Sequence, residues 1–310
     1  MKNPLIHILT FLVGLQVPNA ASGATTYEGD VPIPTFSEVS YGPHGRNVLD
    51  FWQARSDQPT PLVLIIHGGG WTQGSKERAN RFADVQLLLD AGISVAANNY
   101  RLLGHARAEG VSPPVKAPMH DSARALQFLR SKAAEWNLDP DRVGLAGGSA
   151  GACTSLWLAF HDDLADPRSD DPVARQSSRP QHVAVRSAQT TLDPKQMKKW
   201  IPNSRYGGHA FGKKDFNTFL AERESILPWI EQYSPYAVVK QGAPPVAIFY
   251  GNPPAMGKNQ RDPTHSANFG IGLQQRCREL GVECIVVYPG AESASHTDPT
   301  AYLIEKLTNP

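Results

Sequence analysis

Apolar residues along the chain occur in short runs that alternate with longer amphipathic stretches. The segment 62–66 is apolar at every position, which is typical of a central strand buried on both faces of a parallel sheet. Other strands are predicted at 48–52 (as an edge strand), 93–97, 142–146, 183–187, 246–250 and 284–288. Strands that alternate with helical patterns predict an α/β fold with a mostly parallel central sheet flanked by helices.

Helices are predicted where apolar residues recur at helical spacing. The stretch 120–136 has charges between its apolar positions, and 78–91 ends at Gly92, a residue suited to close a helix. A closing helix is expected near 299–307. We find no internal repeat and no low-complexity linker, so we expect one domain over residues 25–310.

A long connection separates the predicted strands 183–187 and 246–250. A connection of this length is expected to have structure of its own and to form a lid or a binding wall. We therefore predict a small cap at about 195–236, which either contacts the substrate or fills a satellite core. Its aromatic residues are Trp200, Tyr206, Phe211, Phe216, Phe219, Trp229, Tyr233 and Tyr236.

The N-terminus has the pattern of an export signal. Lys2 precedes a largely apolar run at 5–17, and small residues follow it. This pattern predicts a signal peptide over 1–24, cleaved near Ala24, and a secreted or periplasmic protein whose mature chain begins near Thr25.

Composition narrows the classes of partner. The 310 residues are 41% hydrophobic and 19% charged, which is typical of a globular protein. Thirty Lys and Arg residues against 29 Asp and Glu give a net charge of +1, so we expect no nucleic-acid partner. No interior stretch reaches 18 uninterrupted apolar residues, so we expect no integral membrane segment in the mature chain. Three cysteines are too few for a disulfide framework, although Cys277 and Cys284 either pair or remain buried thiols.

A candidate nucleophile follows the predicted strand 142–146. The sequence Gly-Gly-Ser-Ala-Gly at 147–151 lies between this strand and a helical run, which is the setting of a nucleophile elbow. In such a turn the Ser149 hydroxyl projects at the carboxyl edge of the sheet. The backbone N–H of Ala150, at the start of the helix, is then free to bind an anion.

A second motif, His-Gly-Gly-Gly-Trp at 67–71, follows the strand 62–66. Consecutive glycines leave backbone N–H groups uncovered, so that these groups can point at a developing oxyanion. With both motifs present, the chain resembles the α/β-hydrolase superfamily, and within it the esterases and lipases similar to hormone-sensitive lipase.

This resemblance covers most of residues 40–308 and carries implications for the site. It implies that Ser149 is the nucleophile and that Gly69, Gly70 and Ala150 donate to the oxyanion, while His67 shapes the glycine loop. The helical cap that such enzymes carry before their first strands is largely missing here. The later insertion is expected to serve as the cover instead.

The general base is expected after the last strand, because it comes last in chain order in this fold. His296 lies in the loop after 284–288 and is the predicted base. His265 lies near the right region but comes too early in chain order. The remaining histidines that we considered have no matching position: His7, His44, His161, His182 and His209.

The orienting acid is less clearly marked. The resemblance implies an acid soon after the strand 246–250, often in the pattern G-x-x-D-P, but the chain has Gly-Asn-Pro-Pro at 251–254. Asp262, which follows a short extra loop, is the favoured candidate. The alternatives are Asp298, Glu292, Asp193 and Asn252.

The resemblance and the motifs together predict a serine carboxylic-ester hydrolase (a carboxylesterase) for short acyl or aryl esters. These include acetyl or feruloyl esters linked to polysaccharides. We expect neither a cofactor nor a metal, because the His and Asp residues lack the spacing of a zinc site. The alternatives are a non-catalytic binding module of the same fold, a lipase and a serine peptidase.

Overall fold

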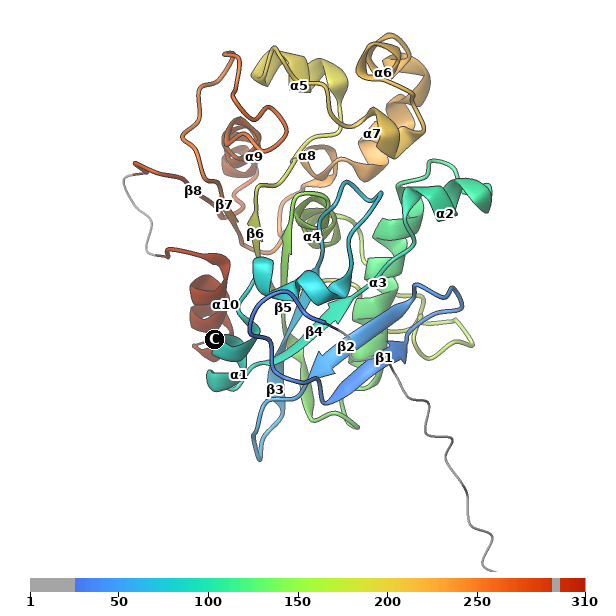
Figure 1. Cartoon of the computed structure of the whole chain (residues 1–310), viewed down its shortest axis with the longest axis vertical. Coiled ribbons are helices and arrows are strands. Elements are labelled where there is room, and N and C mark those ends of the chain that lie inside the picture. The colour runs from blue at the N-terminus through green and yellow to red at the C-terminus, as the bar shows by residue number, and fades with distance from the viewer. Residues whose placement is uncertain (1–25, 292–295, 310) are drawn as a thin grey trace, which may run out of the picture.

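The computed structural model describes residues 26–291 and 296–309, so the predicted signal peptide and Glu292 lie outside the described residues. This part of the chain contains one eight-stranded sheet with the order β1-β2-β4-β3-β5-β6-β7-β8 (Figure 1). The β1–β2 and β2–β4 pairs are antiparallel, and all the other pairs are parallel. The strands are β1 (Phe36–Ser40), β2 (Val48–Trp52), β3 (Thr60–Ile66), β4 (Ser94–Asn98), β5 (Leu138–Gly148), β6 (His182–Arg186), β7 (Val246–Phe249) and β8 (Cys284–Val287).

Helices cover both faces of the sheet, which confirms the predicted fold class. Strand β3 is buried at all seven positions, as its unbroken apolar sequence predicts. Its residue Leu64 belongs to the core formed with α3 (Lys116–Ser131), α4 (Ala150–Phe160) and α9 (Asn268–Glu279). The neighbouring Val63 faces the opposite core, with α1 (Val85–Asp90) and α10 (Pro299–Thr308).

Two predicted elements differ from the structure. The helix expected over 78–91 is a 3₁₀ helix, η1 (Lys76–Arg81), followed by α1, because the Asp84 side chain accepts a hydrogen bond from the backbone N–H of Leu87 and starts a new helix. Strand β2 is not an edge strand, since β1 pairs with it on the outside. Strand β1 escaped prediction because four of its five residues are exposed and its apolar pattern is weak.

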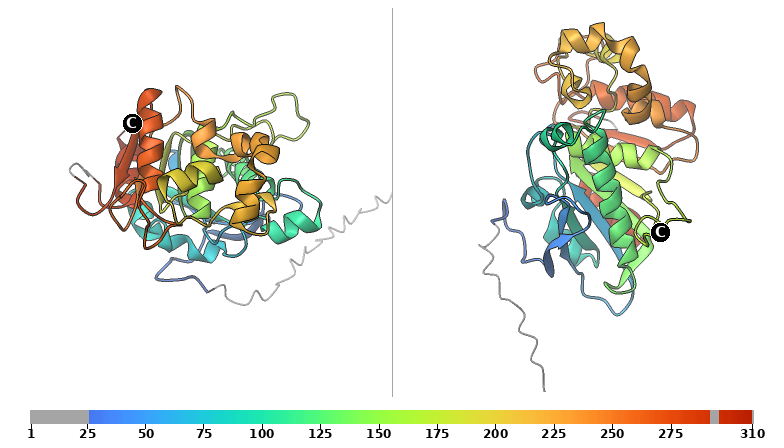
Figure 2. Two further views of the ribbon diagram at one scale, coloured as in Figure 1. Left: turned by 90° about the horizontal axis from the view of Figure 1, so that it is seen from above. Right: turned by 90° about the vertical axis from the view of Figure 1, so that its right-hand side faces the viewer.

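The connection between β6 and β7 lies over the carboxyl ends of the parallel strands, at the top of Figure 1 and of the right-hand view in Figure 2. Its buried aromatic residues, such as Phe211 and Phe219, join the main core. Tyr206 and His209 from the same connection line a cavity described below. It contains α5 (Pro194–Trp200), η2 (Gly208–Phe211), α6 (Phe216–Ala221), η3 (Arg223–Ile226), α7 (Leu227–Tyr233) and α8 (Pro235–Val238).

The remaining helix, α2 (Leu103–Ala108), follows β4. Among the described helices, none is both long enough and apolar enough to cross a bilayer. Cys277 and Cys284 are buried free thiols, as is Cys153.

Candidate active site

Ser149 occupies a sharp turn between β5 and α4. Its backbone has φ 52° and ψ −117°, a conformation that non-glycine residues rarely adopt. The turn requires small neighbours, because a Cβ on Gly151 would lie 2.0 Å from the carbonyl oxygen of Ile66, and one on Gly147 would lie 2.8 Å from the same atom. The glycines therefore let β3, β5 and α4 approach closely enough to place the serine at the carboxyl edge of the sheet.

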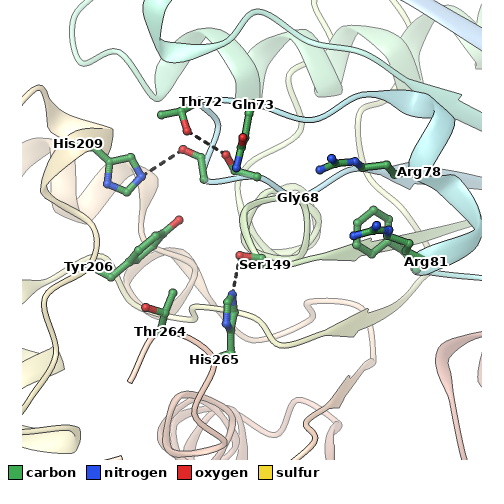
Figure 3. Close-up of a pocket in the computed structure, with 13 residues that line it drawn as sticks. Gly68, Thr72, Gln73, Arg78, Arg81, Ser149, Tyr206, His209, Thr264 and His265 are labelled. Atoms are coloured by element: carbon green, nitrogen blue, oxygen red, sulfur yellow. Dashed lines mark hydrogen bonds between the residues drawn. The ribbon is translucent and has the colours of Figure 1, made fainter. Parts of the chain in front are cut away.

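Ser149, His265 and Asp262 form a hydrogen-bonded chain. The Oγ of Ser149 lies 3.0 Å from the Nε2 of His265, and the Nδ1 of His265 lies 2.9 Å from the Oδ2 of Asp262. A carboxylate only accepts hydrogen bonds, so Nδ1 carries the proton and Nε2 presents its lone pair to the serine hydroxyl. Figure 3 shows this contact below the glycine loop.

The segment 262–265 is a compact turn that holds this geometry. The Oδ1 of Asp262 accepts the backbone N–H groups of Thr264 at 3.1 Å and His265 at 3.2 Å. Partial burial raises the pKa of Asp262, but the hydrogen bonds and charge of His265 and these backbone N–H groups outweigh it and hold the pKa below its ordinary 3.8. The carboxylate is thus an anion near neutral pH, and it fixes the tautomer of the imidazole.

The structure corrects the prediction for the histidine. It pairs Ser149 with His265, whereas the Nε2 of the buried His296 lies 2.7 Å from Glu305 of α10. The His296 ring also packs edge-on against Tyr302, with 5.2 Å between ring centroids. The physical reason is that the loop after β7 folds back over the sheet edge and supplies a histidine earlier in the chain. The signal in the sequence was the three-residue spacing of Asp262 and His265, which lets one turn join both side chains.

The structure also separates the candidate acids. Asp262, the favoured acid, bonds His265, whereas the prediction made it the partner of His296. Asp298 instead accepts hydrogen bonds from backbone N–H groups at the start of α10. Asp193 caps α5 and forms an ion pair with Arg223 at 2.6 Å, and Asn252 lines a cavity beside Ser149.

The predicted oxyanion donors lie beside Ser149. A Cβ on Gly68 would lie 2.7 Å from the carbonyl oxygen of Gly148, so the glycine loop packs directly against the end of β5. Gly69 has φ +111°, and a Cβ there would lie 2.2 Å from the carbonyl oxygen of Gln73. No described residue accepts a hydrogen bond from the backbone N–H groups of Gly69, Gly70 or Ala150. These donors are therefore available to an oxyanion.

His67 supports the glycine loop from beneath. Its Nδ1–H donates to the carbonyl oxygen of Gly68 at 2.7 Å, and its ring stacks on Tyr100 at 4.1 Å between centroids. The Tyr100 hydroxyl in turn donates to the carbonyl oxygen of His67 at 2.8 Å. Burial lowers the pKa of His67 to about 3, so this imidazole is neutral at physiological pH. These contacts give His67 a structural place, as the resemblance implied.

A cavity of about 570 Å³ opens over Ser149, His265 and the glycine loop. The connection between β6 and β7 provides one wall. There the Nε2–H of His209 donates to the carbonyl oxygen of Gly70 at 3.1 Å, and burial lowers the His209 pKa. The buried hydroxyl of Tyr206 has no hydrogen-bond partner among the described residues. Arg78 and Arg81 lie on the opposite side (Figure 3). The site thus has a polar wall and a cationic wall.

One group of acidic side chains has the spacing of a metal site among the described residues: Glu38, Asp50 and Glu77. The ammonium group of the buried Lys76 contacts all three carboxylates, at 2.9 Å for Asp50 and 2.7 Å for Glu77. This ammonium already supplies the positive charge that the cluster needs, so these acids do not fit a metal ion.

Comparison with known proteins gives concordant matches. The model of the BD-FAE family matches residues 49–260. The esterase LipQ of Mycobacterium tuberculosis is 24% identical over 253 residues, which cover 74% of this chain and 52% of LipQ. A chlorogenic acid esterase of Aspergillus niger is 31% identical over 154 residues, which cover 47% of this chain and 29% of that enzyme. The chain thus spans about half the length of LipQ and less of the other relative.

Solved structures show the same fold. A carbohydrate esterase from gut microbiota, in truncated form, superposes with a TM-score of 0.66 at 19% identity, over 92% of this chain and 97% of that chain. An acetyl ester-xyloside bifunctional hydrolase from Caldicellulosiruptor lactoaceticus has a TM-score of 0.58 at 21% identity, over 92% and 95% of the two chains. Both names state the class of enzyme that the sequence predicts, that of hydrolases acting on esters.

Proposed function

The chain belongs to the BD-FAE family of α/β-hydrolases similar to hormone-sensitive lipase, and from this premise we propose that it is a serine carboxylic-ester hydrolase for short acyl or aryl esters. The observation that carries the proposal is the hydrogen-bonded chain Ser149–His265–Asp262 beside a loop of free backbone N–H groups. A nucleophile, a base, an orienting acid and an oxyanion site are the parts that acyl transfer needs.

The reaction begins with attack on the ester carbonyl carbon. His265 takes the proton of Ser149 at Nε2 as the serine oxygen forms its bond to carbon. The carbonyl oxygen becomes an oxyanion, which the N–H groups of Gly69, Gly70 and Ala150 bind. Asp262 stabilises the imidazolium that forms, because its carboxylate already accepts the Nδ1–H.

The tetrahedral intermediate then collapses. Nε2–H of His265 gives its proton to the leaving oxygen, the bond between carbon and that oxygen breaks, and the alcohol departs. A water molecule then attacks the acyl carbon while Nε2 of His265 takes its proton. The bond between that carbon and the serine oxygen breaks as His265 returns the proton to Ser149, and the acid departs. None of these steps calls for a metal or an organic cofactor.

The proposed substrates are esters with a short acyl or aryl group, including acetyl and feruloyl esters on polysaccharides. Support comes from the size of the cavity, about 570 Å³, and from the polar groups of Tyr206 and His209 in its wall. The names of the relatives, a chlorogenic acid esterase and a carbohydrate esterase, favour the same class. Export by the N-terminal segment would bring the enzyme to such polymers. The mature N-terminus of protein recovered outside the cytoplasm tests this part, and we expect it at Thr25.

The test of the activity uses p-nitrophenyl esters of increasing acyl length. We expect the purified protein to hydrolyse acetyl to butyryl esters fastest. Ser149→Ala should lower kcat by a factor of roughly 10⁴ or more, because no other group supplies the nucleophile. Ser225→Ala, at an exposed serine outside the site, is the matched control and should behave as wild type. A rate that rises steadily to long chains would indicate a lipase. A folded protein with no activity on any ester would contradict the proposal.

A further inference from the structure

A second cavity, of about 360 Å³, adjoins the first at Ser149 and His265, which line both. Ser149, His265 and Asp262 line it together with two arginines, Arg81 and Arg186. Unlike the first cavity, it is not lined by residues of the glycine loop. A substrate bound at Ser149 therefore has room for a substituent that contacts a cationic wall.

Arg186 is fixed in this wall by the sheet. It is the last residue of β6, pairs with Gly148 of β5, and accepts the backbone N–H of Ser149 at its carbonyl oxygen, 3.0 Å away. Side chains alternate along a strand, so its side chain extends from the same face as Ala184, toward the core that includes Phe82. Phe82 lines the same cavity.

The Arg186 guanidinium differs from the other partly buried arginines of the described chain because no hydrogen bond or ion pair holds it, whereas each of the others has at least one polar partner. Arg101 forms an ion pair with Asp121 at 2.6 Å. Arg78 forms one with Glu28 at 3.1 Å. Arg46 and Arg130 donate to backbone carbonyl oxygens. No described residue forms an ion pair or a side-chain hydrogen bond with Arg186, although it is only partly exposed.

The acidic side chain that faces Arg186 in the second cavity forms no ion pair with it. Asp262 is the acidic side chain that lines the same cavity, and its Oδ2 and Oδ1 are occupied by His265 and Thr264. Arg186 also lines a neighbouring cavity of about 490 Å³ together with His296, where no acidic residue is among the described lining residues. A partly desolvated guanidinium binds a carboxylate strongly, because two parallel N–H groups match its two oxygens.

We propose that Arg186 is a specificity-determining residue that binds a carboxylate group carried by the ester substrate. This inference rests on the proposed esterase activity and narrows its substrate class to esters with an acidic substituent. The carboxylate belongs either to the acyl part, as in a half-ester of a dicarboxylic acid, or to the alcohol part, as in an acylated hydroxy acid or sugar acid.

Matched pairs of esters test this inference. For the alcohol part the pair is 4-acetoxybenzoate and its neutral analogue 4-acetoxybenzamide. For the acyl part it is mono-(4-nitrophenyl) glutarate and 4-nitrophenyl 4-carbamoylbutanoate. The readout is the ratio of kcat/KM for the charged ester to that for the neutral one, in wild type and variants. The pair whose ratio responds to Arg186 identifies the part that bears the carboxylate.

We expect Arg186→Gln to lower this ratio by roughly 10- to 100-fold for one of the pairs, the loss typical of a charge-assisted hydrogen bond. Arg186→Lys, which keeps the charge but loses the fork of donors, should lie between wild type and the glutamine variant. Arg168→Gln removes the same charge at an exposed arginine outside both cavities and should leave the ratio unchanged.

The two proposals fail in different ways. If wild type hydrolyses both esters of each pair and Arg186→Gln keeps both ratios, the role of Arg186 is overturned while the esterase activity stands. If wild type hydrolyses none of them, the esterase proposal fails. The role of Arg186 is then tested by calorimetry on Ser149→Ala, which measures binding of the ester in the absence of hydrolysis. There, 4-acetoxybenzoate should bind at least 10-fold more weakly when Arg186→Gln is added. Equal binding would overturn the inference, and the lysine variant serves if the glutamine variant does not fold.

Discussion

The loops after β7 and β8 leave neighbouring strands at the same edge of the sheet, yet the histidines of the two loops have different hydrogen-bond partners. The loop after β7 turns back over the edge and places His265 against Ser149 and Asp262 against His265. The loop after β8 carries His296, whose Nε2 is bonded to Glu305 of α10. The comparison shows that the path of the loop over the sheet edge decides which histidine contacts Ser149, and that the order of the histidines in the sequence does not.

The two histidines also differ in what holds them. His265 is held within its own turn, because Asp262 bonds both its ring and its backbone N–H. His296 is held by a helix, through Glu305 and the Tyr302 ring. A base held by an acid in the same turn keeps its Nε2 free to face the hydroxyl, whereas an imidazole bonded through Nε2 to a carboxylate does not.

The largest expected effect tests the different roles of the two histidines directly. His265→Ala should lower kcat on p-nitrophenyl acetate by a factor of roughly 10⁴ or more, because the serine loses its base. His296→Ala should change kcat by less than about threefold and lower the free energy of unfolding by about 1 kcal/mol, from the lost hydrogen bond to Glu305.

Steady-state kinetics and urea unfolding of both variants measure these effects. The reverse pattern, with His296→Ala inactive and His265→Ala active in folded proteins, would restore the prediction made from chain order. It would also contradict the proposed mechanism, in which His265 is the base.

A smaller effect is expected for the acids of the same two loops. Asp262→Asn keeps the shape of the side chain but removes the charge that fixes the His265 tautomer, so kcat should fall by roughly 10²- to 10⁴-fold. Asp298→Asn, the matched change after β8, should retain activity, because asparagine also caps a helix. Comparable losses of kcat in the two variants would show that Asp262 has no special role.

Sequence patterns predicted the elements whose causes are local. The unbroken apolar run at 62–66 is typical of a buried strand, and the structure has β3 there. The glycines around Ser149 are typical of a tight turn, and the structure has that turn after β5. Asp262 was the favoured acid, although as the partner of His296, and the structure pairs it with His265. His265 was missed because its pairing with Ser149 depends on how the loop over residues 250–267, between β7 and α9, folds back in space, and no local pattern encodes this. The exposed strand β1 was missed for the opposite reason, as its pairing with β2 adds little apolar burial.

The smallest effect concerns a third histidine at this edge, His67, which follows β3. We compare this buried histidine with His265, the proposed base. Burial lowers its pKa to about 3, whereas an unfolded chain has a histidine pKa near 6.5. Between these values the unfolded state binds a proton that the folded state does not, so acidification favours unfolding. From pH 7 to pH 5 this single group should lower the free energy of unfolding by about 2 kcal/mol.

His67→Asn retains an N–H donor for Gly68 but cannot take up this proton. Urea unfolding at both pH values should therefore show a pH-dependent loss that is about 2 kcal/mol smaller in the variant than in wild type. An equal loss in both proteins would mean that His67 titrates as it does in the unfolded chain, and that burial beneath the glycine loop does not keep it neutral.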